Sequence, residues 1–257
     1  MCSVHGRGET WRVIPLVYYL PIVTTIVATL FTAELVRRYR RKGGGTHLLW
    51  WALGTATYGA GTLLESSITV FGWHEMLFRL WYVFGALLGG APLAQGSAYL
   101  HLRRPIANRL TVALIAAVLF GTVAVMLTPI DYSLVEATRP AGKVIVWHWV
   151  RLISPVINIY AFVLLAGSAA WSAWRFARIS GQRHRAIGNV LISVGAILPG
   201  IGGSFTRMGY VEVLYVTELL GLLLIYAGYR FATGERRADA SPSLTSSPAS
   251  AHVSLAR

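Results

Sequence analysis

Seven long apolar runs constrain what this sequence can fold into. The hydrocarbon core of a bilayer is about 30 Å thick, and an α-helix needs ~20 residues to cross it. Strands that cross a membrane are only about half as long, so runs of this length indicate helices. The runs are Val13–Val36, Leu48–Phe71, Phe78–His101, Leu110–Ile130, Arg151–Trp174, Ala186–Met208 and Val211–Ala232. They predict an all-α, polytopic integral membrane protein with a seven-transmembrane-helix bundle.

The composition fits a lipid environment and argues against a nucleic-acid partner. Of the 257 residues, 55% are hydrophobic and 13% are charged, and a typical soluble domain has ~25% charged residues. A formal net charge of +13 would suit nucleic acid, but the basic residues lie in short clusters between apolar runs, as in cytoplasmic membrane loops. Cys2 is the only cysteine, so an intramolecular disulfide and a cysteine metal site are excluded.

The basic clusters predict the orientation of the chain in the membrane. Lys and Arg are concentrated after the first, third and fifth runs. These residues are Arg37, Arg38, Arg40, Arg41, Lys42, Arg103, Arg104, Arg109, Arg175, Arg178, Arg183 and Arg185. By the positive-inside rule, the N-terminus lies outside and the C-terminus lies in the cytoplasm. We therefore expect a multi-pass protein of a bacterial inner membrane.

Three regions are expected along the chain. Residues 1–12 form a short extracytoplasmic arm, and residues 13–232 form the transmembrane domain. Residues 233–257 are rich in Ser, Ala and Pro and should be a disordered cytoplasmic tail. The longest outer loop, Asp131–Val150, combines charges with an apolar stretch, which is typical of a short re-entrant or interfacial segment.

The second and third runs are predicted to form a tightly packed hairpin. A polar bend, Gly72-Trp73-His74-Glu75, joins them. Both runs contain small residues, which let membrane helices approach closely. The glycines concerned are Gly54, Gly59, Gly61, Gly85, Gly89, Gly90 and Gly96. Pro92 and Pro199 should kink the third and sixth helices, and Pro155 should bend the fifth.

Several charged residues lie where lipid would penalise them, and such residues are functional hypotheses by default. Glu65 and Glu218 are six and seven residues inside the outer ends of their helices, or roughly 10 Å at 1.5 Å per residue. Arginines at the ends of neighbouring helices lie at a similar level, bordered by His74, Glu75 and Glu212. The predicted ligand-binding layer consists of Glu65, Arg79, His148, Arg151, Asn158, Arg207 and Glu218.

Two interpretations of this layer remain open. In the first, it lines an outward-facing pocket for a small, charged ligand. In the second, the same residues form inter-helical ion pairs and snorkelling contacts that only fix the packing. Glu65 and Glu218 lie too deep for a short carboxylate to snorkel, and either would be a proton relay if protonated.

Polar residues near the inner side have a simpler interpretation. Glu34 lies one turn before Arg37 and Arg38 and is expected to pair with them. A polar group on the third helix should form inter-helical hydrogen bonds with Asn189 on the sixth. That group is Gln95, Ser97, Tyr99 and His101.

The sequence does not support catalysis, a cofactor or a metal. A retinal Schiff base needs a lysine within a helix, and the two lysines, Lys42 and Lys143, lie in loops. His101 and His148 lack a partner histidine at matched depth for haem or chlorophyll. No His-Glu-x-x-His or Gly-x-Ser-x-Gly motif is present. We therefore expect a protein that is not an enzyme.

Three features together resemble a known family. They are the Trp-His-Glu bend followed by Arg79-Leu-Trp-Tyr-Val-Phe-Gly, the Arg183-His-Arg start of the sixth helix, and Gly195-Ala-Ile-Leu-Pro199 within it. With seven helices, they are similar to the N-terminal membrane sensor module of bacterial histidine kinases and diguanylate cyclases. The resemblance implies that residues 13–232 perceive a signal and pass it to an output domain. Because only a short tail follows Ala232, that output is expected on a separate protein.

The leading hypothesis is therefore a non-enzymatic, sensor-like or ligand-binding module that acts through a protein partner in the membrane or cytoplasm. The ligand would be small and extracytoplasmic. One alternative is a structural or accessory subunit of a larger membrane complex, for which the basic cytoplasmic face suits an acidic partner or anionic lipid. A second alternative is a small transporter or channel, against which the absence of inverted repeats weighs.

Overall fold

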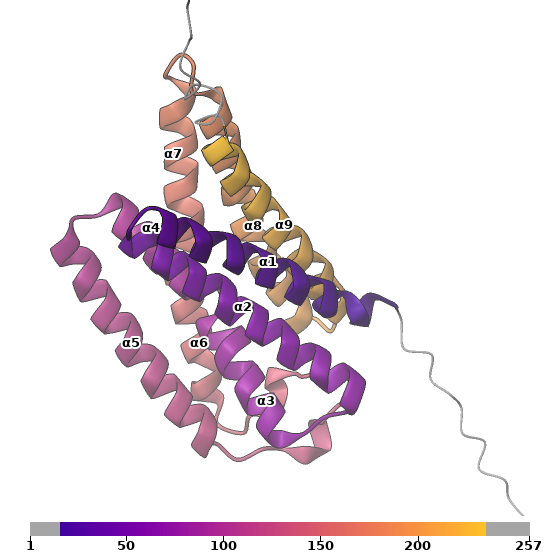
Figure 1. The fold of residues 1–257 in the computed structure, drawn as a ribbon. Coiled ribbons are helices and arrows are strands. Elements are labelled where there is room, and N and C mark those ends of the chain that lie inside the picture. The colour runs from indigo at the N-terminus through magenta and orange to yellow at the C-terminus, as the bar shows by residue number, and fades with distance from the viewer. Residues whose placement is uncertain (1–15, 235–257) are drawn as a thin grey trace, which may run out of the picture.

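The computed structural model describes residues 16–234, and this part of the chain is almost entirely helical (Figure 1). The predicted arm and most of the predicted tail lie outside the described residues. The elements are η1 (Leu16–Tyr19), α1 (Leu20–Arg41), α2 (Thr46–Phe71), α3 (Glu75–Trp81), η2 (Tyr82–Leu88), α4 (Ala91–His101), α5 (Arg104–Leu127), η3 (Tyr132–Leu134), η4 (Gly142–Val144), α6 (His148–Ala161), η5 (Phe162–Gly167), α7 (Ser168–Ala177), α8 (Arg183–Arg207) and α9 (Val211–Gly234). The segments η2 and η5 are π-helical and join their neighbours into two long helices.

Within the described residues, six helical segments are long and apolar enough to cross a membrane. They are Leu16–Arg41, Glu75–His101, Arg104–Leu127, His148–Ala177, Arg183–Thr206 and Val211–Thr233. This finding supports the prediction of an all-helical membrane protein. The predicted second span corresponds to α2, which has 26 residues but is rich in Gly, Thr and Ser and is not among the six.

The helix α2 occupies the centre of the molecule. It packs against α1 on one side, against α3, η2 and α4 on another, and twelve of its residues are buried. Close approach explains its glycines: a Cβ atom on Gly54 would lie 2.7 Å from the backbone nitrogen of Leu93, and one on Gly61 would lie 3.0 Å from the Cα atom of Gly85. The predicted hairpin is therefore observed, with small residues at its contact.

A second tight contact joins α8 to α9. On α8, Gly188 and Gly195 are seven residues apart, and they face Gly228 and Gly221 on α9. A Cβ atom on either α8 glycine would lie 2.6 Å from the carbonyl oxygen of its partner glycine. Figure 1 shows this pair on one side of the molecule and α5 on the other. Because backbone meets backbone along the contact, α8 and α9 form one unit.

The predicted kink in the third helix is a break that begins before Pro92. Gly89 has a φ of +29°, a conformation that favours glycine, and α4 restarts after it with Pro92 in its first turn. The carbonyl of Ala86 accepts hydrogen bonds from Ser154 Oγ (2.8 Å) and Asn158 Nδ2 (3.2 Å) on α6. The break is thus stabilised by a neighbouring helix, as irregular backbone in a membrane requires.

The long loop between α5 and α6 contains no re-entrant helix, which corrects one of the two interpretations of Asp131–Val150. It consists of the short 3₁₀ turns η3 and η4 and an isolated bridge between Ile130 and Ile145. The apolar residues Val144 and Ile145 are buried in the cluster that contains Phe78. We call the end of the bundle that carries this loop the loop end, and the opposite end, with most of the arginines, the basic end.

The polar residues of α4 do form inter-helical hydrogen bonds, but not with Asn189 as predicted. Gln95 donates to the carbonyl of Ala107 (3.0 Å) and to Thr111 (2.7 Å) on α5. His101 contacts Ser172 on α7 at 2.9 Å. The amide of Asn189 instead donates to the carbonyl of Arg185 in its own helix. The prediction failed because α8 packs on α9, α7 and η5 rather than beside α4.

Candidate functional site

The structure brings the two deep glutamates together between α2 and α9. Glu65 on α2 is 2% exposed, and its carboxyl group interacts electrostatically with Glu218 on α9 and lies beside the hydroxyl of Tyr215. Tyr58, two turns before Glu65, donates a hydrogen bond to the backbone carbonyl of Glu218 (3.2 Å). We call Tyr58, Glu65, Tyr215 and Glu218 the acid layer.

The acid layer contains polar atoms without partners. Among the described residues, Glu218 Oε2 and the Tyr215 hydroxyl are buried and form no hydrogen bond. The described ion pairs include neither Glu65 nor Glu218. Buried polar groups are normally satisfied, and each exception needs an explanation. Two neighbouring carboxyl groups without a described cationic partner therefore mark a candidate binding site.

A column of polar side chains leads from the acid layer to the loop end. The ring of Tyr215 meets the ring of Tyr18 edge to face, with centroids 5.7 Å apart. The Tyr18 hydroxyl donates to Glu212 (2.7 Å), and Arg139 of the long loop interacts electrostatically with both. We call Tyr18, Arg139 and Glu212 the polar column. It links the acid layer to the loop that covers this end of the bundle.

Apolar residues close the acid layer toward the basic end. Ala28 and Phe31 on α1 pack with Leu222 and Ile225 on α9. Beyond this cluster, Glu34 accepts hydrogen bonds from Tyr226 (2.6 Å) and Arg230 (3.1 Å).

The partners of Glu34 correct the predicted pairing with Arg37 and Arg38. The guanidinium group of Arg38 donates to Tyr229 instead (3.2 Å). Glu34 was assigned to its sequence neighbours because the packing of α9 against α1 was not known.

Arg79 lies away from the acid layer and has its own partners. It is 8% exposed, forms an ion pair with Glu75 (2.7 Å), and donates hydrogen bonds to the carbonyls of Val125 and Thr128 (2.9 Å for Thr128) at the end of α5. These carbonyls have no partner within their helix. Arg79 therefore stabilises the junction of α3 and α5.

The remaining predicted residues do not join the acid layer as described. His148 is exposed at the start of α6, and Arg151 is half-buried. Asn158 is exposed and contacts Ser154 and the η2 break. Arg207 ends α8, and its side chain lies outside the described residues. The expected convergence of seven side chains is thus reduced to Glu65 and Glu218; whether the other residues bind a ligand remains a prediction.

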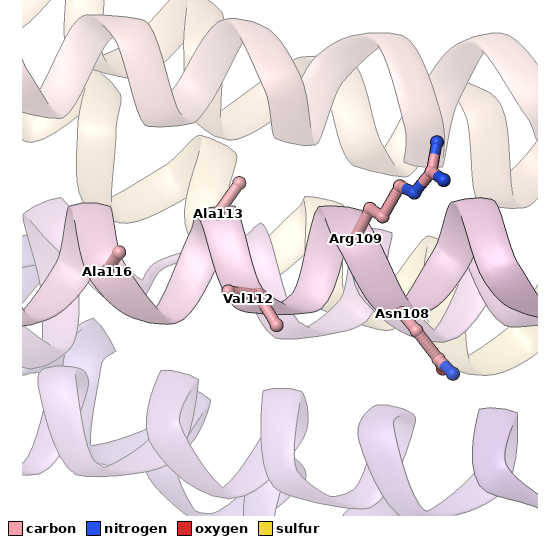
Figure 2. A pocket seen from close by; sticks show the side chains of 5 residues that line it. All are labelled: Asn108, Arg109, Val112, Ala113 and Ala116. Carbon is pink, nitrogen blue, oxygen red and sulfur yellow. The ribbon is translucent and has the colours of Figure 1, made fainter.

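Two surface hollows of residues 16–234 lie away from the acid layer. One extends along α5 and is lined by Asn108, Arg109, Val112, Ala113 and Ala116, whose side chains point to different sides of the helix (Figure 2). The other lies between α7 and α8 and is lined mostly by apolar residues. Neither gathers polar groups around one point, as a ligand site does.

The charges of the long loop predict an acid-sensitive contact. Burial alone would raise the pKa of the Glu136 carboxyl, but hydrogen bonds from Arg139 and Lys143 outweigh burial and hold that pKa below its usual value. The stabilisation is therefore fully present above the unfolded-state pKa of about 4.3 and is lost as the pH falls through the lower, folded-state value. Hydrogen exchange of residues 131–146, corrected for intrinsic rates, should accelerate on acidification. In a Glu136→Gln variant, the amides of residues 131–146 should exchange rapidly at both neutral and acidic pH. Equal acid sensitivity of exchange in that variant and in the wild type would contradict the assignment.

Comparisons with protein-family models, curated proteins and solved structures find no match to this chain.

Proposed function

We propose that this protein is a non-enzymatic, sensor-like membrane module that binds a small cationic ligand at the acid layer and transmits binding to the basic end. One observation carries the proposal: Glu65 is buried, it interacts electrostatically with Glu218, whose Oε2 atom is also buried, and neither has a cationic partner among the described residues. Like charges in a low-dielectric layer repel each other strongly. A positive ligand would relieve this repulsion.

The position of the acid layer supports transmission. Glu65 belongs to α2, which packs against α1, whereas Glu218 belongs to α9, which packs tightly against α8. The acid layer thus lies between two helix pairs. A change in its charge alters the attraction between the pairs, and α9 carries the resulting shift to the basic end, where a protein partner would detect it.

The proposal includes an orientation and a seventh span. At ~1.5 Å per residue, the 26 residues of α2 extend about 39 Å. This helix lies between α1 and the segment α3–α4, both apolar enough to cross. We propose that α2 crosses with them: its Gly, Thr and Ser residues pack against the neighbouring helices, and a stripe of apolar side chains that includes Leu53 and Leu63 faces lipid. The concentration of arginine at the basic end supports an orientation with that end in the cytoplasm and the loop end outside, as expected for a bacterial inner membrane.

A test compares the position of α9 with and without the charges of the acid layer. Spin labels at Arg40→Cys and Thr233→Cys, in a Cys2→Ser background, report the distance between α1 and α9 at the basic end. In lipid nanodiscs, Glu65→Gln combined with Glu218→Gln imitates the neutralised layer and should shift the distance distribution. The loop variant Glu136→Gln is the matched control and should leave it unchanged. Identical distributions in all three proteins would overturn the proposal.

A structural subunit of a larger membrane complex is the second candidate. It is favoured by Arg79, whose hydrogen bonds within the fold leave it little capacity to bind a ligand. Mild-detergent purification of the tagged protein, with mass spectrometry of retained proteins and lipids, separates the candidates. A stoichiometric complex whose assembly survives neutralisation of Glu65 and Glu218 would favour the subunit. A transporter or channel is less well supported, because apolar residues around Phe31 and Leu222 close the column.

A further inference from the structure

We infer that the ligand of the acid layer is the proton, taken up from the loop end through the polar column, so that the module responds to the pH of the compartment which that end faces. This inference rests on the proposed function, because it names the ligand of the same site. It draws on three observations: the chemistry of the layer, the lack of space for a larger ligand, and the path to one end of the bundle.

The chemistry of the layer suits a shared proton. Two adjacent carboxyl groups in an apolar environment are not readily ionised together, and one proton between them removes the repulsion. Around them, α2 contributes Tyr58, and α9 contributes Tyr215 and Glu212. A neutral tyrosine does not supply the missing positive charge, so the proton remains the simplest source.

The charged groups of the neighbouring elements already have partners. From η1 comes Tyr18, which donates to Glu212. From the long loop comes Arg139, which is paired with Glu136 and also interacts electrostatically with Tyr18, Glu212 and Tyr215. On α3, Arg79 is paired with Glu75. The end of α8 contributes Arg207, whose side chain lies outside the described residues.

The acid layer is enclosed by buried side chains, which favours the proton over a hydrated ion or an organic ligand. Tyr215 is fully buried, and Leu222, one turn beyond Glu218, is 2% exposed. Both hollows described above lie on other helices. Within residues 16–234, no group of three His, Cys, Asp or Glu side chains is placed to hold a metal ion. A proton needs no cavity and no further ligand atoms.

The path for the proton has one open direction. Hydroxyl groups both donate and accept hydrogen bonds. The Tyr18 hydroxyl is bonded to Glu212 and its ring meets that of Tyr215, but no described hydrogen bond joins the two hydroxyls, so transfer between them requires an intervening water. The unpartnered hydroxyl of Tyr215 lies beside Glu65. Toward the basic end, the cluster around Phe31 and Leu222 includes Tyr226 and Tyr229. Their hydroxyl groups are engaged with Glu34 and Arg38, away from the acid layer. Uptake adds one proton from water to the carboxylate pair, and release returns it by the same route.

The test uses full-length protein in proteoliposomes with independently set internal and external pH. Infrared spectroscopy should show a protonated-carboxyl band that disappears as the pH at the loop end rises, and the Arg40–Thr233 spin-label distance should change over the same range. Glu65→Gln with Glu218→Gln should abolish both responses, and Glu136→Gln should preserve both. A response that follows the pH at the basic end would overturn the inference. So would one that follows Na⁺ or K⁺ at constant pH.

The two proposals fail in distinguishable ways. If the neutralised variant shifts α9 but the wild-type protein ignores the pH at the loop end, only the proton assignment is wrong. If neither neutralisation nor pH moves α9, the proposed function is wrong as well. Circular dichroism and thermal unfolding in detergent check that the double variant folds. A double variant that folds like the wild type and still responds to pH would also count against the inference.

Discussion

The Gly195→Ala variant is expected to lose about 1–3 kcal/mol of unfolding free energy, the usual cost of overpacking a close contact. The new Cβ atom would lie 2.6 Å from the carbonyl oxygen of Gly221 and 3.0 Å from the backbone nitrogen of Ile225. Both neighbours are backbone atoms, so no side chain can rotate away, and α8 must separate from α9. Unfolding in mild detergent, followed by circular dichroism, measures the loss.

The matched control for this variant lies on the same helix. A Cβ atom on Gly200 would meet no atom within 4 Å, so Gly200→Ala should be neutral or stabilise the protein by up to about 1 kcal/mol, because alanine favours helix over glycine. Equal destabilisation by the two substitutions would show that glycine is needed for helix flexibility rather than for packing. The spin-label response should also weaken in Gly195→Ala, since α8 and α9 would no longer move together.

The contact between the glycines of α8 and α9 could not be predicted from hydropathy. The spacing of Gly188 and Gly195 on α8 matches that of Gly221 and Gly228 on α9, so the repeat is present in the sequence. A hydropathy profile treats glycine as nearly neutral and therefore passes over it. Even a recognised repeat would not identify its partner, because the pairing of two helices is a tertiary property.

The lengths of the helices could be predicted because the bilayer sets them. The run Phe78–His101 corresponds to Glu75–His101 in the structure, and the extra turn begins at the polar bend. The central position of α2 was harder to predict, because hydropathy does not show how much of a helix packs against other helices. The Gly, Thr and Ser content of α2, together with Glu65, was the available signal.

Part of the acid layer could be predicted from the sequence, namely the matching depth of its two glutamates. Counting residues from the helix ends gives depth, and depth correctly matched Glu65 with Glu218. It does not give direction around the helix axis, so residues at similar depth, such as Arg79 and Arg151, were grouped with them although they lie elsewhere. Tyr215, one turn before Glu218 on the same helix, could have been found by helical spacing alone.

The Arg79→Ala variant is expected to lose about 1–3 kcal/mol of unfolding free energy, the cost of leaving buried carbonyl groups without their donor. The substitution removes the ion pair to Glu75 and leaves the carbonyls of Val125 and Thr128 without their donor. Burial makes water a poor replacement, because Arg79 is 8% exposed. Chemical or thermal unfolding in detergent should therefore show a large loss of stability.

Two further variants separate packing from ligand binding in this region. Arg79→Lys keeps the charge, but its single ammonium group cannot reproduce the planar fork that spans Glu75 and both carbonyls, so its stability should lie between wild type and Arg79→Ala. Arg151→Ala removes a half-buried arginine that was predicted at the same level and should change stability little.

If Arg79→Ala instead folds with wild-type stability and loses the pH response of α9, Arg79 belongs to the binding site, and the assignment of Arg79 to the α3–α5 junction is wrong. A stable Arg79→Lys variant that restores the response would strengthen that opposite conclusion, because it would show that charge rather than hydrogen-bond geometry matters at this position.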